Sequence, residues 1–515
     1  MSASPTTAEA QRQRVLPGKP ESFWIDTTAD THFPPLRNEV HVDVAVLGGG
    51  IAGITAAALL RQAGLDVAIV EAGRVIKRVS GCTAAKVTSA HGIIYRHMIT
   101  HFGKDGAQIY ADANQAAIER ISDFIQQQNI YCDFKRTPAY IFIESGSVDE
   151  LRDEFEASKS LNLPVSYKQD VPLPFRTKAA IRFGAQAQFH PRKYLLSLLE
   201  SIPGKNSYIF ENTRALEIKE GEPCQIITDM GVLKAGHVIV ATHFPFVNDG
   251  GHYLKMISKQ SYVLGVLLRG ALPEGMFFNP GEPFATIRSH PHFGGDMLLV
   301  GGEENKTGQG GDVVGHYRRL EEYARSHFDV RSVEYHWTTQ DNVTMDMVPY
   351  VGRLSAQYEK VLVATGFCGW GMTGGTVAGM ILADHILEKT NPWAAFYNSL
   401  RVMPLTAARQ FLSIGAAGEK EFVSGRVPAP SSDIESLASG EGRIVEINKE
   451  KVGVYRDMQG KLHAVSTVCT HMGCTLTWDN AEKSWDCPCH GSRFNYRGQV
   501  IYGPAVTNLE KRRLP

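Results

Sequence analysis

Two short groups of cysteine and histidine near the end of the chain restrict its fold more than any other feature. Cys469-Thr-His471 forms a C-x-H pair, Cys487-Pro-Cys489-His490 contains a C-x-x-H pair, and fifteen residues separate the two pairs. Two thiolates and two imidazoles suit a two-iron cluster with mixed ligands. They also suit a tetrahedral zinc ion. The single residue between Cys469 and His471 is unusual for zinc and favours the iron cluster.

The two segments Cys469-Thr-His471-Met-Gly-Cys474 and Cys487-Pro-Cys489-His490-Gly-Ser492 resemble the Rieske family over about the last 85 residues. This resemblance implies an all-β domain with a [2Fe-2S] cluster on Cys469, His471, Cys487 and His490. It also implies a disulfide between Cys474 and Cys489. The alternative is that both remain buried thiols, as a reducing cytoplasm would favour. Ser492 resembles a serine that hydrogen-bonds a bridging sulfide, and Gly503-Pro504-Ala505 resembles a loop that shields the cluster from water.

Phe494 occupies a position where the Rieske family often has a tyrosine. The phenylalanine removes one hydrogen-bond donor to a cluster thiolate, and such donors stabilise the reduced cluster. We therefore expect a reduction potential below that of quinol-oxidising relatives.

A glycine-rich segment near the N-terminus predicts a dinucleotide site. The apolar run from Val42 to Leu47 precedes a G-x-G-x-x-G pattern, and a helical stretch from Ile54 to Ala63 follows. A pyrophosphate can bind at such a helix N-terminus, and we predict contacts from Gly48, Gly50, Ile51, Ala52 and Gly53. A second strand, from Asp66 to Val70, ends at Glu71, where an acid can bind the adenosine ribose.

The residues that follow indicate which dinucleotide is bound. Ala72-Gly73-Arg74 and the run from Ser80 to Lys86 resemble the flavin-contacting segment of the D-amino-acid, glycine and sarcosine oxidase superfamily. This similarity, over about residues 40–390, implies FAD with contacts from Ala72, Arg74, Thr83, Ala84 and Lys86. Lys86 either faces the flavin or is a solvated lysine.

A second G-x-G-x-x-G pattern, at Gly369, Gly371 and Gly374, has two interpretations. It could bind a nicotinamide dinucleotide, but no further strand with a terminal acid follows it. The superfamily resemblance instead implies that this helix N-terminus stabilises negative charge on the reduced flavin. Further FAD contacts are then expected at Ala215, Ala241, Thr242, Gly366, Trp370, Gly371, Met372 and Thr373. Cys368 is expected to be a packed thiol rather than a covalent flavin link.

The substrate pocket is expected between helical and strand segments. Residues 93–128 have helical periodicity, whereas Lys259 to Leu268 and Phe284 to Val300 are predicted as long strands. The superfamily uses such strands as the floor of its pocket, so Arg288 is either a carboxylate anchor or an ordinary surface arginine. The side chains expected to orient the substrate are Lys86, Lys259, Tyr262, Arg288 and Trp370.

The 515 residues are too many for one core and predict a multidomain α/β (α+β) protein. We expect an arm (1–39), an oxidoreductase unit (40–400), a helix and linker (401–430), and an all-β Rieske domain (431–515). Within the unit, residues 40–92, 185–250 and 340–400 would form a Rossmann-like FAD-binding domain. Residues 93–184 and 251–339 would form a discontinuous, mixed-sheet substrate lobe. The helix is predicted from Leu405 to Val423, before a Pro/Ser linker.

Charge and hydropathy exclude several classes of partner. The net charge is -1 and no basic block occurs, which argues against nucleic acids and anionic membranes. Glycines interrupt the longest uncharged run, Val44 to Leu60, so no membrane span is expected. The polar N-terminus lacks the apolar segment of a secretory signal, which favours a cytoplasmic location.

These features predict an enzyme that oxidises an amine or amino acid with FAD and passes electrons through the cluster to an external one-electron acceptor, such as a redox protein. A dehydrogenase is favoured over an oxidase, because an attached cluster is redundant when oxygen accepts the electrons. The alternative is a reductase that feeds a partner oxygenase from NAD(P)H or ferredoxin, although a second nucleotide domain is missing. An oxygenase would need a further iron site with two histidines and a carboxylate. An oligomer is compatible with the sequence.

Overall fold

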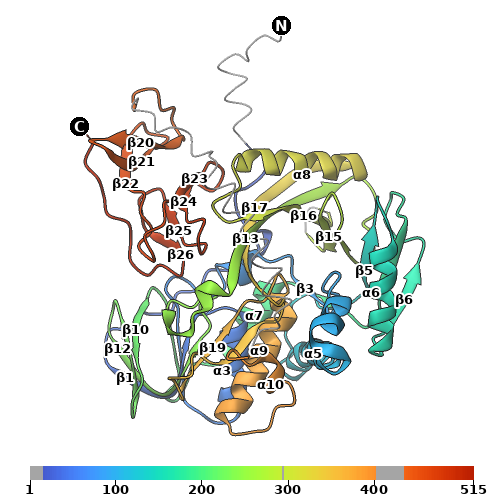
Figure 1. Cartoon of the computed structure of the whole chain (residues 1–515), viewed down its shortest axis with the longest axis horizontal. Helices are drawn as coiled ribbons and strands as arrows, with labels where there is room; N and C mark the ends of the chain where they lie inside the picture. The colour runs from blue at the N-terminus through green and yellow to red at the C-terminus, as the bar shows by residue number, and fades with distance from the viewer. Residues whose placement is uncertain (1–15, 293–294, 402–433, 515) are drawn as a thin grey trace.

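The structure is a computed structural model that describes residues 16–292, 295–401 and 434–514 (Figure 1). The predicted helix from Leu405 to Val423 and the linker after it lie outside these residues. The mixed α/β class with a C-terminal all-β domain is confirmed.

The first sheet has eight strands in the order β10-β11-β12-β1-β2-β9, with β19 beside β12 and β18 beside β19. Its parallel centre joins β1 to β12 and β2, β2 to β9, and β12 to β19. The strands are β1 (Val40–Leu47), β2 (Val67–Val70), β9 (Tyr208–Phe210), β10 (Ala215–Lys219), β11 (Cys224–Thr228), β12 (Val232–Val240), β18 (Tyr350–Arg353) and β19 (Val361–Thr365). Parallel strands that are buried on both faces carry continuous apolar runs, as β19 does.

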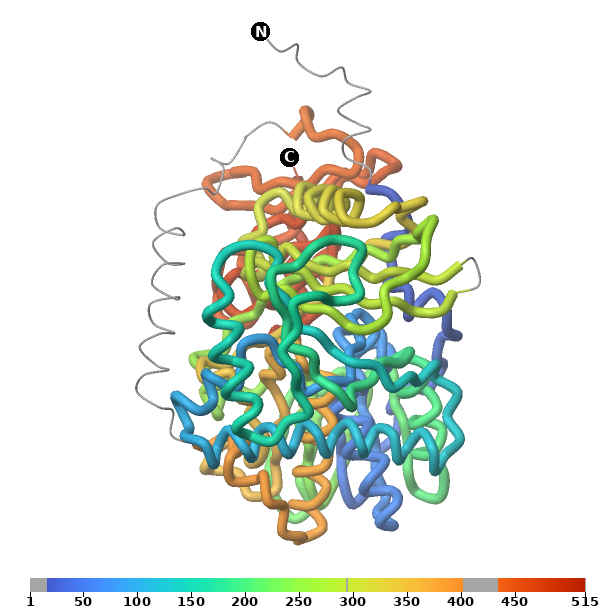
Figure 2. Tube along the Cα trace, turned by 90° about the vertical axis from the view of Figure 1, so that its right-hand side faces the viewer, coloured from blue at the N-terminus to red at the C-terminus, as the bar shows by residue number. Residues whose placement is uncertain are grey.

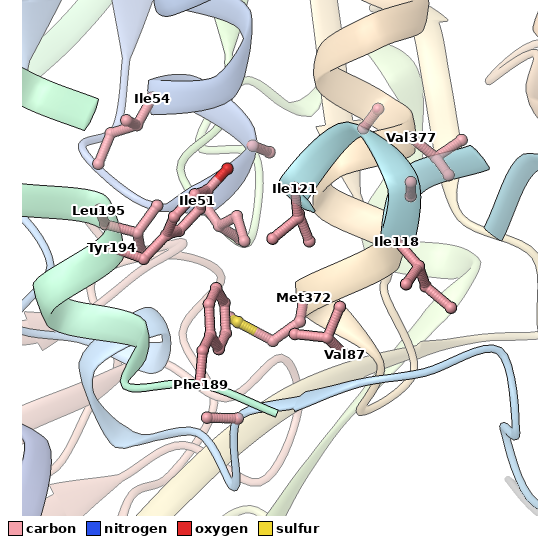
Figure 3. Close-up of a cluster of buried hydrophobic side chains, with 14 of the residues drawn as sticks. Ile51, Ile54, Val87, Ile118, Ile121, Phe189, Tyr194, Leu195, Met372 and Val377 are labelled. Carbon is pink, nitrogen blue, oxygen red and sulfur yellow. The ribbon is translucent and has the colours of Figure 1, made fainter. Parts of the chain in front are cut away.

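The helices α3 (Ile51–Gln62) and α9 (Gly371–Ile386) pack on this sheet and against each other, α5 (Tyr95–Gln127) packs on α9, and α7 (Pro191–Glu200) packs on α3. Their apolar side chains meet in one buried cluster, drawn in Figure 3, that includes Ile51, Ile54, Ile118, Ile121, Tyr194, Leu195, Met372 and Val377. The helix α5 was expected within the substrate lobe, but it packs directly on α9, which was expected in the FAD-binding domain.

The second sheet also has eight strands, in the order β17-β13-β16-β15-β14-β5-β7-β6. They are β5 (Ala139–Ile143), β6 (Val165–Lys168), β7 (Ala179–Phe183), β13 (Met256–Leu268), β14 (Met276–Asn279), β15 (Ala285–His290), β16 (Met297–Lys306) and β17 (Val330–Thr344). The helices α6 (Asp149–Ser160) and α8 (Val313–His327) pack on it. The single strand predicted from Phe284 to Val300 is wrong, because β15 ends before Pro291 and the chain returns as β16.

The C-terminal domain contains two small antiparallel sheets. One comprises β20 (Gly442–Ile447), β21 (Glu450–Arg456) and β22 (Leu462–Ser466). The other comprises β23 (Thr477–Asp479), β24 (Ser484–Asp486), β25 (Arg493–Asn495) and β26 (Val500–Tyr502). The domain lies beside α8 in both views (Figures 1 and 2), where Asn480 Nδ2 donates to Asp312 Oδ1 over 3.0 Å.

Short elements complete the description. They are α2 (Phe23–Asp26), α4 (Val79–Cys82), α10 (Ala394–Tyr397), the 3-10 turns Asn248–Gly250 and His252–Leu254, and a small sheet of β3 (Lys86–Val87), β4 (Lys135–Arg136) and β8 (Ala187–Gln188). The N-terminal arm is anchored where Trp24 is buried and donates from Nε1 to the Thr83 carbonyl over 2.7 Å. Among the described residues, no helix combines the length and apolar character needed to cross a bilayer.

Candidate functional site

The predicted glycine-rich turn connects β1 to α3 in a conformation that only glycine accommodates. Gly48 has a φ of +111°, and a Cβ at this position would lie 2.4 Å from the Ala241 carbonyl oxygen. A Cβ at Gly53 would lie 2.2 Å from the carbonyl oxygen of Gly48. These two positions bring the N-terminus of α3 against the ends of β1 and β12, so a groove opens at the carboxyl edge of the parallel strands.

This groove is a cavity of about 180 Å³, and we call it the FAD groove. Of the predicted FAD contacts, it is lined by Gly48, Gly50, Ile51, Ala52, Glu71, Ala72, Arg74, Thr83, Ala215, Ala241, Thr242, Gly371 and Met372. Glu71 accepts hydrogen bonds from the backbone N–H groups of Gly49 and Gly73, over 3.0 and 2.8 Å. Its carboxylate thus connects the glycine turn to the chain after β2.

Three predicted contacts lie outside the lining of both cavities, namely Gly53, Gly366 and Thr373. Gly53 lies at the α3 close approach described above. Gly366 has a φ of +76°, and an added Cβ would lie 2.3 Å from Thr344. Thr373 is buried and donates to the Thr88 carbonyl over 3.0 Å.

A second, larger cavity of about 570 Å³ adjoins the FAD groove, and we call it the substrate cavity. Thr83, Asp341, Gly369 and Met372 line both cavities, so the two spaces meet there. Of the predicted residues, Ala84, Lys86, Lys259, Tyr262 and Trp370 line the substrate cavity.

Two lysines of this cavity are already engaged. Lys86 Nζ donates to the Phe277 carbonyl over 2.7 Å and to the Thr286 hydroxyl. Burial, together with the charge of Arg288, holds the pKa of Lys86 well below its usual value. Lys259 Nζ pairs with Glu304 Oε2 at 2.6 Å.

Arg288 is not in the cavity wall. Its guanidinium is buried and donates to the backbone carbonyls of Ala85 and Phe189, over 2.5 and 3.2 Å. These bonds stabilise the loop before β3. A buried Arg288 outside the cavity wall is neither the expected carboxylate anchor nor the expected surface arginine.

The C-terminal domain brings the four predicted cluster ligands together in two loops. The rings of His471 and His490 lie 5.1 Å apart between centroids, and Cys469 and Cys487 are both buried. A hydrogen bond from Cys487 lowers the pKa of the Cys469 thiol below its usual value. The disulfide between Cys474 and Cys489 is formed and connects the two loops.

The histidine tautomers suit metal ligation. Nδ1 of His471 and Nδ1 of His490 are both buried without a hydrogen-bond partner. His471 Nε2 lies 3.0 Å from Asn248 Oδ1, so Nε2 carries the proton and Nδ1 keeps a lone pair. Two unpartnered imidazole nitrogens beside two thiols fit a mixed-ligand cluster.

The loop predicted to shield the cluster also lines the FAD groove. Residues 501–506 form part of that lining, and the Ala505 N–H donates to Ser492 Oγ over 3.0 Å. The FAD groove itself holds His243 Nε2, which is buried and has no hydrogen-bond partner. The glycine turn and this free nitrogen fit a dinucleotide with polar ring atoms.

The loop that carries His490 contacts the back of the substrate cavity. Ser258 Oγ donates to the His490 carbonyl over 3.3 Å, and Gln340 Nε2 donates to the Gly491 carbonyl over 2.9 Å. Successive side chains alternate between the two faces of a strand. Accordingly Lys259 and Asp341, the next residues on β13 and β17, line the substrate cavity. One sheet layer therefore separates the cluster loop from that cavity.

Sequence reasoning missed Asp341, His243 and the entry of residues 501–506 into the FAD groove. His243 directly follows the predicted contacts Ala241 and Thr242, and this position in the sequence could have indicated it as a further FAD contact. Asp341 is an isolated acid among the uncharged residues from Trp337 to Thr344. No local pattern indicated the position of residues 501–506.

Comparisons with known proteins agree with both halves of this description. The family model for FAD dependent oxidoreductases (DAO) matches residues 43–385, and the model for the Rieske [2Fe-2S] domain matches residues 428–513. The chain is 38% identical over 495 residues to the putative Rieske 2Fe-2S iron-sulfur protein YhfW of Bacillus subtilis strain 168, covering 96% of this chain and 97% of that protein.

Two further similarities concern the oxidoreductase unit. The gamma-glutamylputrescine oxidoreductase of Escherichia coli K12 is 23% identical over 415 residues, 75% of this chain and 93% of that protein. The crystal structure of glycine oxidase from Geobacillus kaustophilus has a TM-score of 0.60 at 16% identity, covering 71% of this chain and 100% of that one. At this identity the structural match establishes the fold alone.

Proposed function

Because the chain belongs to the DAO family of FAD dependent oxidoreductases and carries a Rieske [2Fe-2S] domain, we propose that it oxidises an amine or amino acid and passes the electrons within one chain from flavin to cluster. Bound FAD would accept two electrons as a hydride, and the cluster would accept them one at a time. The substrate that gives gamma-glutamylputrescine oxidoreductase its name supports this substrate class.

The observation that carries this proposal is the contact of the cluster domain with both cavities. Residues 501–506 line the FAD groove, and the His490 loop is hydrogen-bonded to the strands that form the wall of the substrate cavity. A cluster held against a flavin site is useful only when electrons move between them. We therefore favour a dehydrogenase with an external one-electron acceptor over an oxidase.

Several side chains would contribute to binding and orientation. Gly48 and Gly50 let the N-terminus of α3 approach a pyrophosphate, and Glu71 would bind the ribose or fix the turn that does. In the substrate cavity, Lys86, Lys259, Tyr262 and Trp370 would orient the substrate and exclude water. Cys469, Cys487, His471 and His490 would hold the cluster.

The test is anaerobic reduction of the purified holoprotein by a panel of amines and amino acids, with NADH and NADPH in separate samples. We expect an amine or amino acid to bleach the flavin and then to generate the paramagnetic signal of the reduced cluster. A Cys469→Ser variant should still bleach but should fail to reduce a one-electron acceptor. Reduction by a nicotinamide alone would instead support a reductase, and rapid peroxide formation with oxygen would support an oxidase.

A further inference from the structure

Asp341 is an unpaired acid at the junction of the FAD groove and the substrate cavity. The Gly369 N–H lies near its carboxylate, and no ion pair between described side chains includes Asp341. Burial and the nearby charge of Glu304 raise the pKa of this carboxyl to about 7, with burial the larger cause. The Gly369 N–H acts in the opposite direction and lowers the pKa. A cation placed here would relieve both the burial of the carboxylate and its repulsion by Glu304.

The cationic side chains of the same cavity leave little to bind an anion. Lys86 is held by the Phe277 carbonyl and Thr286, and Lys259 is paired with Glu304. His91 is uncharged, because burial lowers its pKa to about 3, and its Nδ1 lies 2.6 Å from Tyr110 Oη. Arg288 lies outside the lining.

Aromatic side chains form part of the wall of the same cavity. Trp370 stacks on His91 with 4.7 Å between ring centroids and contacts Phe278 at 5.3 Å. The rings of Trp370, Phe278 and Phe284 all line the cavity. Aromatic faces accept apolar groups and also attract cations.

We propose that Asp341 binds the nitrogen of the substrate, and that this substrate is an organic amine cation without a carboxylate on the carbon that is oxidised. The proposal rests on the proposed function and narrows its substrate class. The carbon beside a nitrogen releases a hydride only when the nitrogen is uncharged. Asp341 therefore also accepts one ammonium proton: an N–H bond breaks, a carboxyl O–H bond forms, and no oxidation state changes.

The test measures binding rather than turnover, so it uses amines that have no hydrogen on the carbon bearing nitrogen. The probes are tert-butylamine, 2-phenylpropan-2-amine and 1-adamantanamine. The neutral comparison is 2-phenylpropan-2-ol, and the amino acid comparison is 2-amino-2-phenylpropanoic acid. Dissociation constants are measured by titration calorimetry on the oxidised holoprotein. The proteins are the wild type, Asp341→Asn and, as a matched acid of the same cavity, Glu304→Gln.

We expect at least one amine to bind the wild type at least about tenfold more tightly than the alcohol or the amino acid. Asp341→Asn should weaken that amine by about 10- to 100-fold, because a charge-assisted bond is lost. Glu304→Gln should weaken it less than Asp341→Asn does, because the Glu304 carboxylate is partly exposed and already paired with Lys259. Unchanged flavin absorption and melting temperature would verify that Asp341→Asn is folded.

Equal binding of the amine by wild type and Asp341→Asn would overturn the proposal. Tighter binding of the amino acid, or no binding of any amine, would also overturn it. These outcomes are separate from failure of the proposed function. That failure would appear as Asp341-dependent amine binding in a protein whose flavin no amine reduces.

Discussion

The buried ion pair between Arg401 and Asp346 allows a quantitative test of what stabilises the oxidoreductase unit against unfolding. Arg401 donates from Nε and Nη2 to the two carboxylate oxygens of Asp346, over 2.8 and 2.7 Å. The same guanidinium donates to the carbonyls of Val348 and Pro349, over 2.6 and 3.0 Å, and lies 4.2 Å from the Tyr350 ring centroid. The pair stabilises the turn from β17 to β18, which joins the wall of the substrate cavity to the FAD-binding sheet.

The perturbation is Arg401→Met, which keeps most of the side-chain volume and removes the charge. The Asp346 side chain is fully buried and that of Arg401 is 8% exposed, so the remaining carboxylate would be an uncompensated buried charge. Removing one partner of such a pair costs about 3 to 5 kcal/mol of unfolding free energy. For residues 43–385, an unfolding entropy of about 2.1 cal/mol/K per residue converts this cost to a fall in Tm of about 4 to 7 °C.

Scanning calorimetry would measure Tm, with the rise in free flavin fluorescence identifying the transition of this unit. The control is Lys135→Met, because Lys135 and Glu274 form a pair whose side chains are 57% and 81% exposed. That change should cost less than about 1 kcal/mol. The double change Asp346→Asn with Arg401→Met should recover part of the loss, since no charge remains buried. A fall in Tm of less than about 1 °C for Arg401→Met, no larger than the control, would refute the reasoning.

Three further predictions concern the cofactor sites. Replacing both Cys474 and Cys489 by serine should destabilise the cluster domain by about 3 kcal/mol, because the disulfide closes a loop with a sequence separation of 15 and restricts the unfolded chain. Thermal loss of the cluster's visible circular dichroism should then begin at a lower temperature. An unchanged onset temperature would contradict this prediction. His471→Ala should abolish the Rieske paramagnetic signal while flavin content stays at the wild-type level, and retention of the signal would exclude His471 as a ligand. Glu71→Gln should raise the dissociation constant of FAD by about tenfold or more, because two backbone N–H groups lose a charged acceptor; equal FAD retention after dialysis would count against a role for Glu71.

The features that sequence reasoning found were those encoded by local spacing. Cys469, His471, Cys487 and His490 were predicted as ligands because ligand spacing within a loop is set by cluster geometry, and the fold brings their two loops together. Gly48 and Gly53 were recognised because close backbone approach excludes a Cβ. Both kinds of constraint act over a few residues, so one sequence is enough to show them.

The features that sequence reasoning missed depend on contacts between distant segments. Arg288 was expected to be either a carboxylate anchor or a surface arginine, but it is buried and its donors are satisfied by carbonyls about one and two hundred positions earlier. Asp341 became a candidate only when the fold set it between two cavities. The strand predicted from Phe284 to Val300 divides because Pro291 follows β15, a local signal that was available.

The loop from Ile501 to Val506 has a consequence for how the protein matures. Because this loop is synthesised after residues 43–385, the wall of the FAD groove is incomplete while the oxidoreductase unit leaves the ribosome. The flavin thus has its widest access before the C-terminal domain has folded. Once that domain packs in position, residues 501–506 complete the lining of the groove, so the site that would hold the flavin is finished only when the iron–sulfur domain is in place.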